Sequence, residues 1–92
     1  MGLKGPFKLT DQNLYFVPSK PGVYLLGNQD GHVIYVGKSD RDLADRLKEQ
    51  LRTAHVEATQ FWYWDTWSPQ EASDLSETLI KKYVPSGNPV TQ

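Results

Sequence analysis

The chain of 92 residues contains no cysteine, which excludes disulfide bonds and metal sites built from thiolates. It also lacks an apolar run of roughly 18 residues, the length that a membrane-spanning helix needs. An excess of charge of one sign is absent as well, because 10 Lys and Arg residues stand against 11 Asp and Glu residues. A nucleic-acid partner would therefore have to be bound by a local basic patch.

The chain begins without the basic and apolar leader of a secreted protein, so we expect a cytoplasmic location. Its length is sufficient for one small domain with a modest core. The first part of the chain contains two prolines and only a short apolar group. We expect residues 1–20 to form an irregular arm that packs on the domain through Tyr15 and Phe16, and residues 21–92 to form the domain itself.

Two β-prone runs flank a turn-forming cluster. Residues 22–27 and 32–37 are rich in Val, Ile, Leu and Tyr, and residues 28–31 read Asn-Gln-Asp-Gly, which predicts a β-hairpin. A two-residue turn would place Tyr24 and Tyr35 diagonally across the strand pair, and a four-residue loop would place them directly opposite. Both registers put the two side chains on one face of the sheet.

The two faces of this hairpin are expected to differ. Gly22 and Gly37 share the tyrosine face, where the absence of side chains leaves the backbone open to a large molecule. The other face is apolar and is expected to join the core. Its side chains are Val23, Leu25, Ile34 and Val36.

The remaining elements are two helices and a third strand. Leucines recur every four residues within 38–54, and Ser39 or Asp40 can cap this helix. The aromatic run 60–66 predicts a strand, and the sequence Ser-Pro-Gln-Glu at 68–71 marks the start of the last helix. The order is β-β-α-β-α, which predicts an α/β (α+β) fold with a small three-stranded antiparallel sheet flanked by helices.

The tyrosines belong to a longer pattern. Gly22-Val23-Tyr24 is followed after ten residues by Tyr35-Val36-Gly37, which resembles the paired motif of the GIY-YIG nuclease superfamily. The match continues through Lys38-Ser39, Leu43-x-x-Arg46-Leu47, Leu79-Ile80, Pro85 and Asn88. Members include homing endonucleases and the incision subunit of bacterial nucleotide-excision repair. The resemblance covers residues 22–88 and implies the GIY-YIG fold.

The resemblance implies an endonuclease that hydrolyses DNA phosphodiester bonds in one displacement with a single divalent cation, Mg²⁺ or Mn²⁺. Tyr24 would be the general base and Tyr35 would orient the attacking water. Because a tyrosine has an ordinary pKa near ~10, the base role needs positive charge nearby, and Lys38 is placed to supply it. Arg46 would bind the scissile phosphate, and Asn88 would help to order the site.

Substrate contacts are expected from Gly37, Arg41 and Arg46. The implied partner is DNA, with branched and single-stranded forms as candidates, and not a membrane. Since the domain has no separate element for reading DNA sequence, we expect specificity to come from a homodimer or from a larger repair or recombination partner.

The last helix departs from the family pattern at its metal ligand. The family places a glutamate four residues before the second of the paired apolar positions, and here that position is Ser76. Glu77 is the candidate ligand in this chain, although helical geometry puts it roughly 130° from the centre of the apolar stripe. A serine hydroxyl is a poor ligand for Mg²⁺. The alternative function is therefore a catalytically degenerate domain that binds nucleic acid or another protein.

Overall fold

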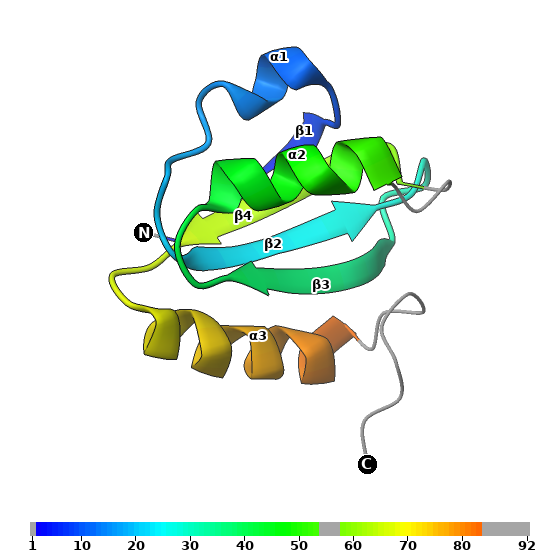
Figure 1. Ribbon diagram of the computed structural model, residues 1–92. Coiled ribbons are helices and arrows are strands. Elements are labelled where there is room, and N and C mark those ends of the chain that lie inside the picture. Colours follow the sequence, from blue (N-terminus) through cyan, green and yellow to red (C-terminus); the bar gives the residue numbers. More distant parts are fainter. Residues whose placement is uncertain (1, 54–57, 84–92) are drawn as a thin grey trace.

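An antiparallel sheet of four strands with helices on both faces makes up the computed structural model, which describes residues 2–53 and 58–83 (Figure 1). In chain order the elements are β1 (Lys4–Lys8), α1 (Asp11–Leu14), β2 (Gly22–Gly27), β3 (Val33–Ser39), α2 (Leu43–Thr53), β4 (Gln60–Asp65) and α3 (Pro69–Tyr83). The strand order is β1-β4-β2-β3, so β3 lies at one edge. This arrangement confirms the predicted α+β class.

The first 20 residues contain regular structure, so the prediction of an irregular arm was wrong and the sheet has four strands instead of three. β1 pairs with β4 and forms the second edge of the sheet. Its sequence, KGPFK, has a single large apolar residue and a proline. A proline is tolerated in an edge strand, but such a segment lacks the alternating pattern by which strands are predicted.

The segment after β1 packs on the domain through residues other than the expected aromatic ones. Leu14 and Val17 are buried, whereas Tyr15 is 87% exposed and Phe16 is 52% exposed. Phe16 makes an edge contact with Phe7 of β1 at a centroid distance of 5.2 Å. The short helix α1 turns Leu14 inward.

The β2–β3 hairpin closes through a loop of residues 29–31, a length between the two that we considered. The backbone N–H of Asn28 donates to the carbonyl of His32 at 3.0 Å, and the N–H of Gly31 donates to the carbonyl of Asn28 at 3.0 Å. Gly31 has a φ of +88°, a conformation that this turn requires and that glycine adopts without steric cost.

An irregularity in β3 then sets the register of the tyrosines. The pairing shifts between Leu26 and Gly27, which adds one residue to β3 and places Ile34 in the same core cluster as Tyr24. Ile34 was therefore predicted on the wrong face, because alternation along a strand holds only where no bulge interrupts it. Past the bulge Tyr24 pairs with Gly37, so the two tyrosines are diagonal neighbours.

Each face of the sheet is covered by a helix (Figure 1). On one face, Leu43 and Leu47 of α2 pack in one cluster with Tyr24. On the other face, Ala72 and Leu79 of α3 pack with β2 and β3. The tyrosine face is thus a core face and is not open as expected, and Tyr24 is buried in it. Within residues 2–53 and 58–83, no helix is long and apolar enough to cross a membrane.

Capping side chains fix the starts of both long helices. The carboxylate of Asp42 accepts from the backbone N–H of Asp45 at 3.0 Å, so the cap of α2 lies after the predicted Ser39 or Asp40. Ser39 accepts from the N–H of Asp42 at 2.8 Å and orders the preceding turn. In α3 the hydroxyl of Ser68 accepts from the N–H of Glu71 at 3.2 Å, which confirms the predicted cap.

Candidate active site

A pocket of about 350 Å³ opens at the β3 edge, between α2 and α3. We call it the tyrosine pocket. It brings together Tyr24 of β2, Tyr35 of β3, Arg46 of α2 and Ser76 of α3. The other described residues that line it are Val36, Gly37, Lys38, Gln50 and Ile80. Five of the residues predicted for the site therefore converge here: Tyr24, Tyr35, Gly37, Lys38 and Arg46.

The two tyrosines pack against each other and depend on the glycine beside them. Their ring centroids lie 6.0 Å apart with an interplanar angle of 37°. Tyr24 is only 1% exposed, and its ring crosses the backbone of Gly37, its partner in the strand pair. A Cβ atom at position 37 would clash with Cζ and Oη of Tyr24. Glycine at this position thus creates the space that the phenol occupies.

Burial raises the pKa of Tyr24 far above its ordinary value of 10.0, because the phenolate would lose its hydration. The neighbouring Tyr35 raises the pKa further, while the positive charge of Arg46 acts in the opposite direction. A hydrogen bond to Tyr35 and the charge of Glu49 add to the rise. Tyr24 therefore holds its proton at neutral pH, and it can act as a base only when more positive charge enters the pocket.

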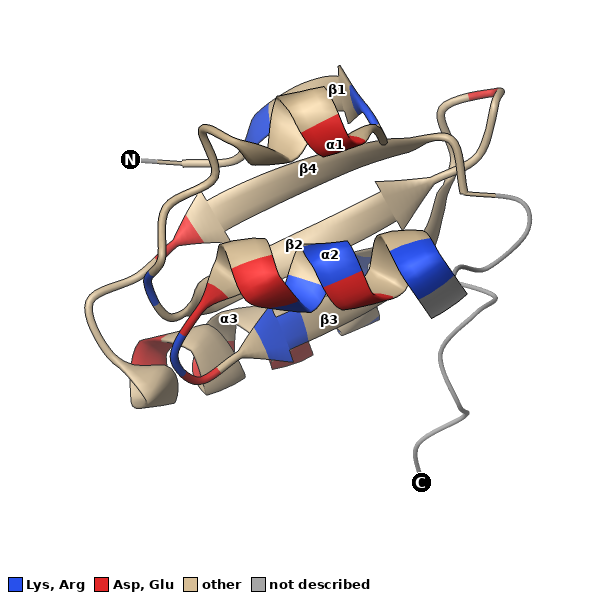
Figure 2. Cartoon of the chain, turned by 45° about the horizontal axis from the view of Figure 1, so that its top comes forward, with Lys and Arg blue, Asp and Glu red and all other residues tan. Residues whose placement is uncertain are grey.

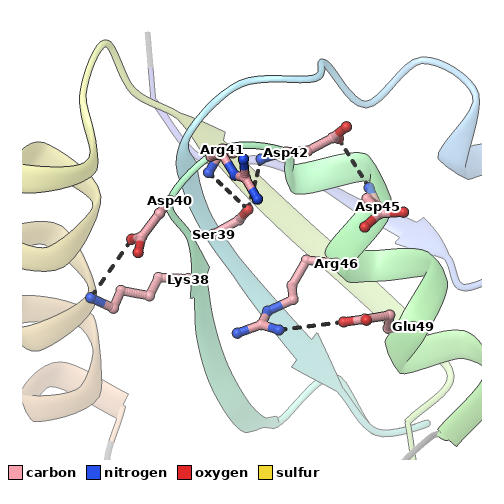
Figure 3. Close-up of a pocket in the computed structure, with 8 residues that line it drawn as sticks. All are labelled: Lys38, Ser39, Asp40, Arg41, Asp42, Asp45, Arg46 and Glu49. Atoms are coloured by element: carbon pink, nitrogen blue, oxygen red, sulfur yellow. Dashed lines mark hydrogen bonds and ion pairs between the residues drawn. The ribbon is translucent and has the colours of Figure 1, made fainter.

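Arg46 lies at the rim of the tyrosine pocket and is anchored from its own helix. Its Nη1 donates to Oε1 of Glu49 at 3.3 Å (Figure 3). The Arg46 side chain is 52% exposed. A guanidinium carries five N–H donors in a rigid fork, so a phosphate can bind it alongside Glu49.

Lys38 extends toward α3 (Figure 3). Its Nζ donates to Oγ of Ser73 at 3.3 Å and lies 3.9 Å from Oδ1 of Asp40. The charge that lowers the pKa of Tyr24 is that of Arg46, so Lys38 does not have the effect that we expected from its position in the sequence. Arg41 lines an adjoining pocket of about 580 Å³ instead of the tyrosine pocket.

The position of the expected metal ligand is occupied by a buried serine. Ser76 is 7% exposed, and its Oγ donates to the carbonyl of Ser73 at 2.9 Å. Glu77 is exposed and is not among the described residues that line the tyrosine pocket. In residues 2–53 and 58–83, no three His, Asp or Glu side chains form a group that could hold a metal ion. Asn88 lies outside the described residues.

These residues do not fit a Mg²⁺ site that takes a carboxylate from α3. A hard cation needs charged oxygen ligands, and Ser76 offers a neutral hydroxyl already committed to the helix backbone. Sequence reasoning also missed two contributors to the site. Gln50 follows Arg46 by four residues, a helical spacing that could have revealed it, whereas no sequence signal links Ser73 to Lys38.

A family model described as a domain of unknown function, DUF7508, matches residues 3–83. Among curated proteins, UvrABC system protein C of Clostridium kluyveri is 41% identical over 88 residues, covering 85% of this chain and 14% of the relative. The same protein of Methanosphaera stadtmanae is 40% identical over 84 residues, covering 78% of this chain and 14% of the relative. The chain thus spans a small part of the length of these relatives.

Among solved structures, the GIY-YIG N-terminal endonuclease domain of UvrC from Thermotoga maritima, bound to its catalytic magnesium, superposes with a TM-score of 0.71. It is 32% identical, with 85% of this chain and 93% of that chain covered. A tyrosine-to-phenylalanine mutant of the same domain gives a TM-score of 0.72 at 31% identity, with 86% and 93% covered.

Proposed function

Because the chain belongs to the GIY-YIG nuclease superfamily and to the DUF7508 family, we propose that it binds DNA at the tyrosine pocket. In this proposal it hydrolyses the phosphodiester bonds of the bound DNA. The observation that supports this proposal is the convergence of Tyr24, Tyr35 and Arg46 on one pocket at an edge of the sheet. The structural neighbours are endonuclease domains with a catalytic divalent cation, and they share the fold over most of the chain.

In this proposal each side chain has a separate task. Arg46 binds two oxygens of the phosphate and stabilises the charge that develops as water attacks phosphorus. Tyr35 orients the water, and Tyr24 takes its proton as the bond from phosphorus to the leaving oxygen breaks, and the leaving oxygen takes up a proton from solvent. Because Tyr24 is protonated in the free protein, it must first lose its own proton. Positive charge in the pocket favours that loss.

The proposal also covers the substrate form, the cellular location and the source of specificity. We propose DNA in branched or single-stranded form as the substrate, a cytoplasmic location, and specificity supplied by a second copy of the chain or by a larger repair partner. The balanced charge of the chain supports the last point, because a net charge of −1 gives little general attraction to DNA.

Cleavage of supercoiled plasmid and of branched and single-stranded oligonucleotides, with Mg²⁺ or Mn²⁺ added, tests the hydrolytic proposal. Tyr24→Phe keeps the ring packing but removes the hydroxyl, so we expect the rate to fall by at least about 100-fold. Tyr15→Phe is the matched control, because this tyrosine is 87% exposed and lies outside the tyrosine pocket, so its rate should equal that of the parent. Cleavage by Tyr24→Phe at the parental rate would contradict the role of Tyr24.

One observation favours a second function, in which the domain binds nucleic acid or a protein and cuts nothing. Ser76 places a hydroxyl where the family has its metal-binding carboxylate, and the hydroxyl is bonded to the helix. Ser76→Glu restores the carboxylate. An inactive parent together with a cutting Ser76→Glu variant would show a domain that has lost its metal ligand and would favour the binding function, whereas a parent that cuts in a Tyr24-dependent way would exclude it.

A further inference from the structure

We propose that the tyrosine pocket binds a phosphodiester through Lys38 and Arg46 without a divalent cation, with the Lys38 ammonium serving as the cation beside Ser76. This inference rests on the proposed function, and it specifies the binding step that both functions require. It follows from a difference at one position. The neighbouring structures hold a divalent cation, whereas α3 of this chain has Ser76 in place of the carboxylate that the family pattern uses as a metal ligand.

The charge of the pocket lining supports the binding of an anion. Two of the described lining residues, Lys38 and Arg46, are cations, and none of those described is a carboxylate. The remaining polar groups include the phenol of Tyr24, which keeps its proton because burial raises its pKa. Such a lining attracts an anion and repels a divalent cation. It therefore suits a phosphate better than Mg²⁺.

The position of Lys38 supports its role as the cation beside Ser76. Its Nζ lies 3.3 Å from Oγ of Ser73, and Ser73 is joined through its carbonyl to the hydroxyl of Ser76 at 2.9 Å. The ammonium of β3 thus reaches the turn of α3 that holds Ser76. In Figure 2 the basic position on β3 lies between α2 and α3. An ammonium has three N–H donors, so it can contact Ser73 and a phosphate together.

The carboxylates that pair with the two cations do not block this role. Asp40 lies 3.9 Å from Lys38 and Glu49 lies 3.3 Å from Arg46, with all four side chains between 44% and 65% exposed. Exposed ion pairs of this kind add little stability, and a phosphate can compete with them. Both carboxylates line the adjoining pocket and not the tyrosine pocket (Figure 3). They leave the tyrosine pocket free of negative charge along its described lining.

Fluorescence anisotropy with a short, labelled single-stranded DNA oligonucleotide tests the inference on the full chain, in EDTA and then in Mg²⁺ at matched ionic strength. We expect the two dissociation constants to agree within about twofold. Lys38→Ala should weaken binding in EDTA by about tenfold and reduce the slope of log affinity against log salt by about 0.7. Lys8→Ala is the matched control, because β1 forms the opposite edge of the sheet, and its affinity should stay close to that of the parent.

Ser76→Glu gives an independent readout. A carboxylate beside Lys38 should weaken binding in EDTA by about tenfold, and Mg²⁺ should restore it. Binding by the parent only in Mg²⁺, or parental affinity of Lys38→Ala, would overturn the inference and leave the proposed function standing. An absence of binding in both buffers, to this oligonucleotide and to a branched one, would overturn the inference and the proposed function together. Circular dichroism of each variant separates loss of binding from loss of folding.

Discussion

At the scale of the residue, the site depends on a space that glycine leaves for a phenol. Gly37→Ala would place a methyl group against Cζ and Oη of Tyr24. We expect a loss of about 1–3 kcal/mol in the free energy of unfolding, measured by urea denaturation. Combining it with Tyr24→Phe should cost less than the sum of the two single changes, because the missing hydroxyl relieves part of the clash. Additive losses would show that the two residues do not compete for space.

The buried phenol of Tyr24 also makes the stability of the fold depend on pH in the alkaline range. Burial raises the pKa of Tyr24 above the value of 10.0 that it has in the unfolded chain. Above that pH the unfolded state releases this proton while the folded state keeps it, so stability falls as pH rises. Urea unfolding above about pH 10 should show a decline that is smaller in Tyr24→Phe by about 1.4 kcal/mol per pH unit. Equal slopes would mean that Tyr24 ionises alike in both states.

At the scale of the element, the start of α2 determines where Arg46 lies. The carboxylate of Asp42 caps the helix through the N–H of Asp45, and Arg46 follows within the first turn, its N–H bonded to the carbonyl of Asp42. Asp42→Ala should lower the free energy of unfolding by about 1 kcal/mol and weaken DNA binding. Asp40→Ala removes a nearby carboxylate that is 65% exposed and should change stability by less than about 0.5 kcal/mol. Thermal denaturation compares the two, and equal melting temperatures would contradict the capping role.

The elements that the sequence predicted well are those with strong local signals. β2 spans the predicted residues 22–27, and Ser68 caps α3 as expected, because strand composition and capping act within a few residues. β1 was missed because its pairing with β4 depends on a distant strand, and its own sequence has no alternation. The bulge at Ile34 was missed because loop length and register are determined together when the hairpin closes.

At the scale of the whole molecule, the site lies at the β3 edge of the sheet, where α2 on one face and α3 on the other both contribute side chains. The motif residues predicted Tyr24, Tyr35 and Arg46, and these converge on the tyrosine pocket. The contact of Lys38 with Ser73 was not predictable, because it requires α3 to pack against the sheet beside β3 (Figure 1). Such a placement follows from packing of the two apolar clusters and not from any local pattern.

The most direct measurement is a two-dimensional amide NMR titration of the folded chain with a short single-stranded DNA oligonucleotide. The proposal that the tyrosine pocket holds the phosphodiester predicts that the largest shifts cluster at Gly37, Lys38 and Arg46 and at Ser76 across the pocket, with small shifts along β1. Largest shifts on β1 or on the exposed side of α1, with the tyrosine pocket unchanged, would contradict it.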